Sequence, residues 1–280
     1  MTKIGQMVAS LLRPRRRFYP APVFLGDRVF AVTHRGHVIY LLPSDLDLTP
    51  RILLNGNWEP HVEQTLASFL RPGDTAIDLG ANVGYHTLAM AAAVGPSGQV
   101  HAFEANPDLT PLLAATLYAN GLRDWEGGGC VKLYQGAVLD RPGAVTLAWA
   151  PDHYASGHVM VDSGPGYSKR IEVPAVTLDG VLSDRVEKVD LIRMDIEGSE
   201  PLALRGAQLL IERSPSVKIV SEWVVEFMRS RTDVEAFVAW LAEQGFKFWR
   251  IEPGPRLLRM EPSAAAESPP CEMFLSRQNV

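Results

Sequence analysis

Apolar and polar residues follow a regular alternation through most of this chain. From residue 74 onward, short apolar runs are separated by longer segments in which apolar residues recur at helical spacing. The pattern predicts strands near 75–79, 99–104, 131–135, 189–195, 217–223, 246–251 and 271–276, and helices near 84–94, 108–120, 199–213 and 232–244. Such an alternation of strands and helices is typical of an α/β fold, a parallel sheet with helices on both faces.

The part before residue 58 has a different pattern. Residues 23–42 alternate apolar and polar positions around two glycine-containing turns, which predicts short antiparallel strands. A helix is predicted over 55–70, with Pro60 near its start. We therefore divide the chain into an N-terminal helix and β-hairpin segment, residues 1–57, and a main domain, residues 58–280.

The first seventeen residues combine an apolar helical stripe with a basic stretch. The stripe consists of Ile4, Met7, Val8, Leu11 and Leu12, and arginines follow within 13–17. A short helix of this kind can lie on an anionic membrane surface. It can also dock on its own domain or on a partner subunit, and we favour docking. A homo-oligomer is left open.

Residues 140–180 interrupt the strand–helix alternation. Apolar stretches at 144–150 and 171–176 flank a loop over 151–167 that contains glycine, proline and histidine. A loop of this length is either a substrate lid or simply the tip of a hairpin. Residues 261–270 are low in complexity and predict an exposed loop before the last strand.

The first strand of the main domain leads into a turn that indicates a nucleoside site. The turn follows Asp78-x-Gly80-x-Asn82-x-Gly84, and the next strand ends in Glu104. A dinucleotide fingerprint requires Gly-x-Gly-x-x-Gly, and Asn82 replaces its middle glycine. A carboxylate at Asp78 would repel a pyrophosphate but suits a cation. S-adenosylmethionine has an ammonium group, a sulfonium and no phosphate, so the spacing favours it over a nicotinamide cofactor.

A second motif lies further along the chain, where residues 189–200 read Val-Asp-Leu-Ile-Arg-Met-Asp-Ile-Glu-Gly-Ser-Glu. Together with residues 74–84, this segment resembles the FkbM family of S-adenosylmethionine-dependent methyltransferases, and matching elements run from about 58 to about 276. The resemblance implies a Rossmann-like class I methyltransferase fold with about seven strands, the last antiparallel. It also implies O-methylation of a hydroxyl on a sugar, glycan or polyketide-type natural product.

Two other functions stay open at this point. One is a non-catalytic module that binds a nucleoside cofactor, although the intact acids at the strand ends argue against it. The other is a nicotinamide-dependent oxidoreductase. The residues themselves do not identify the methyl acceptor, whether small molecule or glycan.

Ligands of parallel sheets bind at the carboxyl ends of the strands. The residues predicted to contact the cofactor are therefore Asp78, Gly80, Ala81, Asn82, Gly84, Tyr85, Glu104, Asn106, Gly136, Ala137 and Asp195. Glu104 is expected to bind the ribose and Asp78 to lie near the methionine ammonium. Asn106, Gly136 and Ala137 are expected to border the adenine. The alternatives are an ordinary tight turn and, for Glu104, a helix cap.

Asp195 is the predicted catalytic base, because a carboxylate at this rim can take the proton of an acceptor hydroxyl. The alternative is an ion pair with Arg193, which projects to the same side of the strand. His86 is a second catalytic candidate that either borders the methyl site or packs on the sheet, and His153 and His158 are reserve bases. Predicted substrate contacts are Glu59, Arg193, Glu197 and Glu222. The alternatives are a helix cap for Glu59 and an acid in the first turn of a helix for Glu197.

No metal is predicted. If one is present, the macrocin O-methyltransferase family, whose fold is similar, implies Mg²⁺ on acids at the fourth and fifth strand ends, here Asp195 and Glu222. A single acid at the fifth strand leaves that site few ligands.

Composition narrows the classes further. With 280 residues, 46% of them hydrophobic, the chain can bury one large core. A net charge of −5 provides no basic field for nucleic acid. The two cysteines predict no disulfide framework, and no apolar run reaches the roughly 20 residues that span a bilayer. The N-terminal apolar residues precede the arginines, so no signal peptide is expected, and we predict a cytoplasmic protein.

Overall fold

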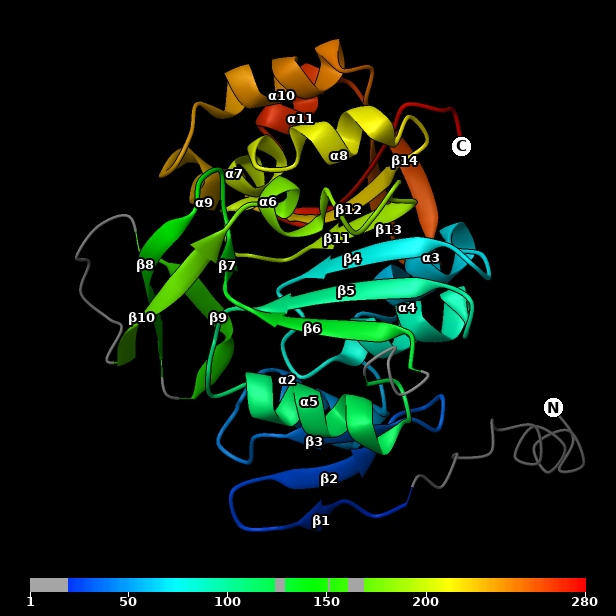
Figure 1. The fold of residues 1–280 in the computed structure, drawn as a ribbon, viewed down its shortest axis with the longest axis vertical. Helices are drawn as coiled ribbons and strands as arrows, with labels where there is room; N and C mark the ends of the chain where they lie inside the picture. The colour runs from blue at the N-terminus through cyan, green and yellow to red at the C-terminus, as the bar shows by residue number, and fades with distance from the viewer. Residues whose placement is uncertain (1–19, 124–128, 151, 161–168) are drawn as a thin grey trace, which may run out of the picture.

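The structure, a computed structural model, describes residues 20–123, 129–150, 152–160 and 169–280. Within these residues the main sheet has eight strands (Figure 1). From one edge to the other they are β14 (Arg256–Met260), β13 (Lys247–Glu252), β15 (Cys271–Ser276), β12 (Lys218–Trp223), β11 (Leu191–Met194), β4 (Thr75–Leu79), β5 (Gln99–Glu104) and β6 (Val131–Gln135). The five strands from β12 to β6 are parallel.

This arrangement confirms the predicted α/β fold with a mostly parallel, Rossmann-like sheet. Each of the strands predicted for the main domain is present, and the last one, β15, runs antiparallel to its neighbours β12 and β13, as expected. The sheet has one strand that was not predicted. β14 pairs with β13 at the edge, and its exposed, arginine-containing sequence does not alternate like a buried strand.

Two apolar cores cover the two faces of the sheet. On one face α3 (Pro60–Phe69), α4 (Tyr85–Val94) and α5 (Thr110–Ala119) pack, and on the other the helices from α6 to α11 (Figure 1). The second group consists of α6 (Leu178–Leu182), α7 (Glu200–Arg205), α8 (Gln208–Arg213), α9 (Val225–Arg229), α10 (Val234–Glu243) and α11 (Pro262–Ala266). Along β11, Leu191 belongs to the first core and Ile192 to the second, which is the side-chain alternation of a strand buried on both faces.

Several helix predictions need correction. The helix predicted over 199–213 is divided into α7 and α8 at Gly206, where a Cβ would lie 2.1 Å from the carbonyl oxygen of Leu139. The helix predicted over 55–70 begins only at Pro60, and a separate helix, α2 (Leu48–Asn55), precedes it. The exposed loop predicted over 261–270 is wrong, because α11 buries Ala265 and Ala266 against the core.

The N-terminal segment forms the antiparallel strands that were predicted, β1 (Val23–Phe24), β2 (Val29–Val32) and β3 (Val38–Leu41). Side chains of α5 bind the outer edge of β3: the Tyr40 amide donates to Thr116 Oγ1 at 3.1 Å, and the Val38 amide to Asn120 Oδ1 at 3.0 Å. A third apolar core joins β2 and β3 to residues of the main domain. The domain boundary near residue 57 therefore stays a prediction. The helix proposed for residues 1–17 lies outside the described residues.

A second sheet forms beside the carboxyl ends of β5 and β6 (Figure 1). Its order is β7 (Ala137–Val138), β10 (Lys169–Val176), β8 (Gly143–Ala150) and β9 (His153–Val159). The apolar stretches predicted at 144–150 and 171–176 are β8 and β10. Part of the loop predicted over 151–167 is strand β9, and residues 161–168 lie outside the described part. Among the described residues no helix is long and apolar enough to cross a membrane.

Gly84 is placed where a side chain would be costly. It has φ +97°, and a Cβ there would lie 2.7 Å from Leu113 Cδ1 on α5. Gly84→Ala should therefore lower the free energy of unfolding by about 2–4 kcal/mol, from backbone strain plus overpacking. Gly26 is a matched control, with φ +90° and nothing within 4 Å of its Cβ position, and Gly26→Ala should cost only about 1–2 kcal/mol. Urea denaturation measures both, and equal losses would contradict the packing argument.

Candidate active site

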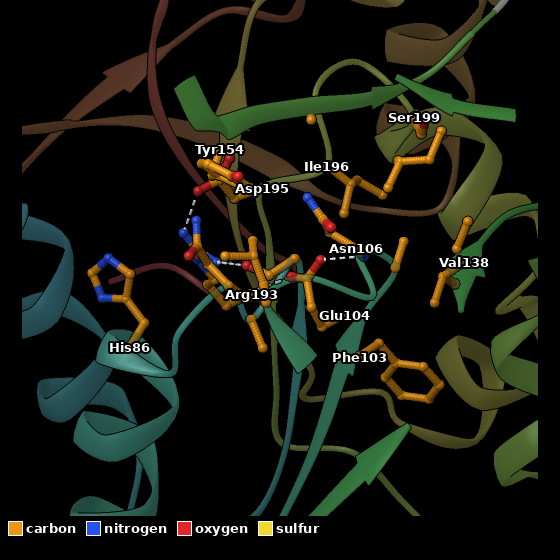
Figure 2. A pocket seen from close by; sticks show the side chains of 18 of the residues that line it. His86, Phe103, Glu104, Asn106, Val138, Tyr154, Arg193, Asp195, Ile196 and Ser199 are labelled. Carbon is orange, nitrogen blue, oxygen red and sulfur yellow. Dashed lines mark hydrogen bonds and ion pairs between the residues drawn. The ribbon is translucent and has the colours of Figure 1, made fainter. Parts of the chain in front are cut away.

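A cavity of about 900 Å³, open mouth included, lies at the carboxyl ends of β4, β5 and β11 (Figure 2). Eleven of the residues predicted from the sequence line it: Gly80, Ala81, Asn82, Tyr85, His86, Glu104, Asn106, Gly136, Ala137, Arg193 and Asp195. They come from separate segments of the chain, and the sheet brings these segments together around one cavity.

The remaining predicted site residues do not line this cavity. Asp78 is fully buried behind it, where its carboxylate accepts hydrogen bonds from Thr87 Oγ1 at 2.5 Å and from Arg193 at 3.3 Å. Gly84 contacts α5 rather than the cavity. Glu59, Glu197 and Glu222 are also absent from its lining. The geometry therefore does not favour direct contacts between these five residues and a ligand in the cavity.

Other lining residues were not among the predicted catalytic, cofactor or substrate contacts. They are Leu48, Trp58, Phe103, Ala105, Leu109, Val138, Leu147, Tyr154, Gly157, Val159, Ile196 and Ser199. Tyr154, Gly157 and Val159 belong to β9, so part of the suspected lid is a wall of the cavity. The reserve base His153 instead pairs with Asp47 at 2.8 Å, and neither it nor His158 lines the cavity. Tyr154 could have been proposed from the sequence, because it is an aromatic residue in a long loop and binding residues are often found in loops.

Glu104, at the tip of β5, is held by two backbone amides. Its Oε1 accepts from the Asn106 amide and its Oε2 from the Asn82 amide, both at 2.7 Å (Figure 2 draws the first of these). Burial raises the pKa of Glu104 to about 7, although the two amides act to lower it. Each oxygen keeps a further lone pair, so the carboxylate is pre-oriented to accept hydrogen bonds from a ligand.

Arg193 is buried at the centre of the site (Figure 2). Its guanidinium donates to Asp78 at 3.3 Å, to the carbonyl oxygen of Gly80 at 2.9 Å and to Asp195 at 2.5 Å. The ion pair between Arg193 and Asp195, which we considered as an alternative, is therefore present. One cation joins the glycine turn to the candidate base.

Carboxyl groups outnumber cations around Asp195. Oxygen atoms of Asp195, Glu197 and Glu222 lie within 4.8 Å of one another. Burial, together with the neighbouring acids, raises the pKa of Glu197 to about 8 and of Glu222 to about 11. Both shifts favour the protonated form of these carboxyl groups. Such a cluster is compatible either with protons shared between the carboxyl groups or with a bound divalent cation. In the second case Glu197 would be a third metal ligand beside Asp195 and Glu222, the two named from the sequence.

His86 is paired with Glu59, whose Oε2 lies 3.1 Å from His86 Nε2. Burial acts to raise the pKa of Glu59, but the bond to His86 and the charge of Arg193 lower it overall, so Glu59 is a carboxylate. Glu59, Asn82 and Glu197 are the non-glycine residues with positive φ in the described chain, at 43°, 52° and 54°. Strained backbone of this kind gathers at functional sites.

Residues 78–248 match the sequence profile of the methyltransferase FkbM domain. The chain belongs to the FkbM methyltransferase family. This membership confirms the resemblance read from residues 74–84 and 189–200.

Two relatives of this FkbM-family protein are named as methyltransferases. A 31-O-demethyl-FK506 methyltransferase FkbM from Streptomyces tacrolimicus is 29% identical over 167 residues, 50% of this chain and 61% of the relative. A protein-L-isoaspartate O-methyltransferase from Hyperthermus butylicus is 27% identical over 147 residues, 45% of this chain and 60% of the relative. The chain thus spans less than two thirds of the length of these relatives.

Solved structures with a similar arrangement include an O-methyltransferase from Bacillus cereus in complex with S-adenosylhomocysteine. Its TM-score is 0.46 at 14% identity, over 79% of this chain and 82% of that one. An S-adenosylmethionine-dependent O-methyltransferase from Thermotoga maritima has a TM-score of 0.43 at 14% identity, over 91% and 84%.

The raised pKa values predict that stability depends on pH. Folding raises the pKa of Glu104 and Glu200 to about 7, and of Glu197 and Glu272 to about 8, from 4.5. The folded state then binds more protons, so the free energy of unfolding should be highest near pH 4.5 and fall as the pH rises to about 8. Glu197→Gln removes one such group and should flatten the decline by up to about 1.4 kcal/mol per pH unit. Urea titrations across this range test it, and an unchanged slope would contradict it.

Proposed function

We propose that this protein transfers a methyl group from S-adenosylmethionine to a hydroxyl oxygen of a sugar, glycan or polyketide-type natural product. The observation on which this rests is the Glu104 carboxylate, fixed by two amides inside a cavity bordered by the Gly80–Asn82 turn. Family membership supports methyl transfer. The name of the Streptomyces relative supports oxygen as the acceptor atom.

The residues around the cavity fit this cofactor. Asn106 Nδ2 and Ser199 Oγ are buried, line the cavity and have no hydrogen-bond partner among the described residues. An adenosine could satisfy Asn106, because a ring nitrogen can accept a hydrogen bond from its Nδ2. The ribose hydroxyls of the same adenosine could donate to Glu104. The surplus of carboxyl groups favours a cationic cofactor and disfavours the pyrophosphate of NAD.

Each predicted residue then has a role. Glu104 binds the ribose hydroxyls, Gly136 and Ala137 border the adenine, and the Gly80–Asn82 backbone lies along the methionine. S-adenosylmethionine, when bound, supplies an electrophilic methyl carbon. Asp78, predicted to lie near the ammonium group, accepts a hydrogen bond from Arg193 and so acts on the site from behind.

Asp195 is the residue we assign as base. It lines the cavity, and burial raises the pKa of its carboxyl against the lowering effect of Arg193, which favours proton acceptance. A carboxyl oxygen of Glu222 lies within 4.8 Å of one of Asp195, and Glu59 orients His86. These contacts replace the direct substrate contacts predicted for Glu59 and Glu222. Ser199 and His86 also line the cavity, and we assign them the role of orienting the acceptor hydroxyl.

One incubation tests the function. The protein is mixed with methyl-labelled S-adenosylmethionine and a panel of nucleotide sugars, glycans and hydroxylated polyketides, and labelled product is sought by mass spectrometry. We expect label on an acceptor oxygen. Cofactor binding without any transfer would favour a non-catalytic module, and binding of NAD instead would favour an oxidoreductase.

Glu104→Ala should weaken binding of S-adenosylmethionine by roughly 1.5–3 kcal/mol, the scale of hydrogen bonds to a charged group. Glu172→Ala makes the same change at an exposed position of β10 and should leave binding unaltered. Calorimetric titration gives both dissociation constants. Normal affinity in the Glu104 variant would remove the ribose assignment.

Asp195→Asn should leave the affinity for S-adenosylmethionine nearly unchanged and reduce turnover by about 10²-fold or more, the lower end of general-base contributions. If Asp195 serves only as the partner of Arg193, the variant should instead lose stability and keep its rate per folded molecule. Melting temperature, affinity and turnover on one variant separate these outcomes. EDTA added to the wild type tests for a metal, and we expect no effect. A loss of activity that Mg²⁺ restores would place a metal at Asp195, Glu197 and Glu222.

A further inference from the structure

Glu63, on α3, is a buried carboxylate that the proposed chemistry does not use. It is 1% exposed and does not line the cavity. Its Oε1 accepts a hydrogen bond from Arg35 Nε and lies 3.5 Å from His34 Nε2, and its Oε2 accepts from the Tyr85 hydroxyl. Two of these partners, Arg35 and His34, come from the turn between β2 and β3 in the N-terminal segment.

Tyr85 connects this group to the cavity. It is the first residue of α4, directly after the glycine turn, and its side chain lines the cavity. Besides donating to Glu63, its hydroxyl lies 3.3 Å from Nδ1 of His34. The hydroxyl of Tyr85 therefore links the cavity wall both to one buried carboxylate and to the hairpin turn.

The arrangement depends on the charge of Arg35. A carboxylate as buried as Glu63 is stable only when it is paired and hydrogen-bonded. Arg35 supplies the cation from a side chain that is 40% exposed, so the hairpin turn provides a charge that α3 lacks at this point. Without Arg35, the Glu63 carboxylate would lose its charged partner and move toward solvent, and the Tyr85 hydroxyl would lose its fixed acceptor.

We propose that Arg35 and Glu63 are positioning residues, which hold Tyr85 in the cavity wall so that cofactor affinity depends on the N-terminal hairpin. Both lie outside the segment that matches the family, residues 78–248. The inference rests on the proposed function, because it takes S-adenosylmethionine and its product as the ligands of this wall.

The test is a double-mutant cycle on ligand affinity. Arg35→Met, Tyr85→Phe and the double variant are titrated calorimetrically with S-adenosylhomocysteine, and their melting temperatures are recorded. Arg35→Met should weaken binding about tenfold, and in the Tyr85→Phe background the same change should have a much smaller effect. Arg35→Lys keeps the charge and should restore most of the affinity. Arg28→Met removes an exposed ion pair with Asp27 in the turn between β1 and β2 and should leave the affinity unchanged.

The outcomes that overturn the inference are specific. If Arg35→Met lowers the melting temperature but keeps wild-type affinity, its role is structural only. If the effects of Arg35→Met and Tyr85→Phe are additive, the coupling does not pass through Tyr85. Should Arg35→Met fail to fold, Glu63→Gln, which keeps the shape and removes the charge, takes its place in the cycle. A wild-type protein that does not bind S-adenosylhomocysteine would instead refute the proposed function.

Discussion

The burial of the Arg193 guanidinium is the constraint on which the rest of the site depends. A buried cation must find anionic or carbonyl partners, and it finds Asp78, the Gly80 carbonyl and Asp195. Arg193 stands opposite Asp78 in the register of β11 and β4, so the sheet pairing itself sets this contact. Gly80 permits the close approach, since a Cβ there would lie 1.9 Å from the Asp195 carbonyl oxygen. One side chain thus fixes both the turn and the candidate base.

The balance of charge around this cation shapes what the cavity can bind. Glu197, Glu222 and Glu272 have raised pKa values because burial and repulsion from Asp195 and Glu200 disfavour their ionisation. An anionic ligand would add to that repulsion, whereas a sulfonium and an ammonium would relieve it. Ionisation of the same acids lowers the free energy of unfolding. The charges that favour a cationic cofactor therefore destabilise the fold as the pH rises.

The fold could be predicted from the sequence because the strands of the main domain are buried on both faces and their helices are strongly apolar. β14 and α11 escaped prediction, since their places depend on distant partners: β14 on pairing with β13, and α11 on the hydrogen bond from Trp223 Nε1 to the Ala265 carbonyl at 2.9 Å.

The candidate site was predictable to the extent that it lies on strand ends. Strand periodicity placed Asp78 and Glu222 near the rim but could not say that other side chains would separate them from the cavity. Trp58 and Tyr154 come from segments without a motif, and the contact between Arg35 and Glu63 joins two elements that no local pattern relates. Contacts distant in sequence are set by packing, which periodicity does not encode.

The central claim is that Glu104 and its surroundings bind the nucleoside of a cationic, phosphate-free cofactor. Calorimetric titration of the wild-type protein with S-adenosylmethionine and, separately, with NAD tests it most directly. The account predicts saturable binding of S-adenosylmethionine and none of NAD. Binding of NAD alone would contradict it.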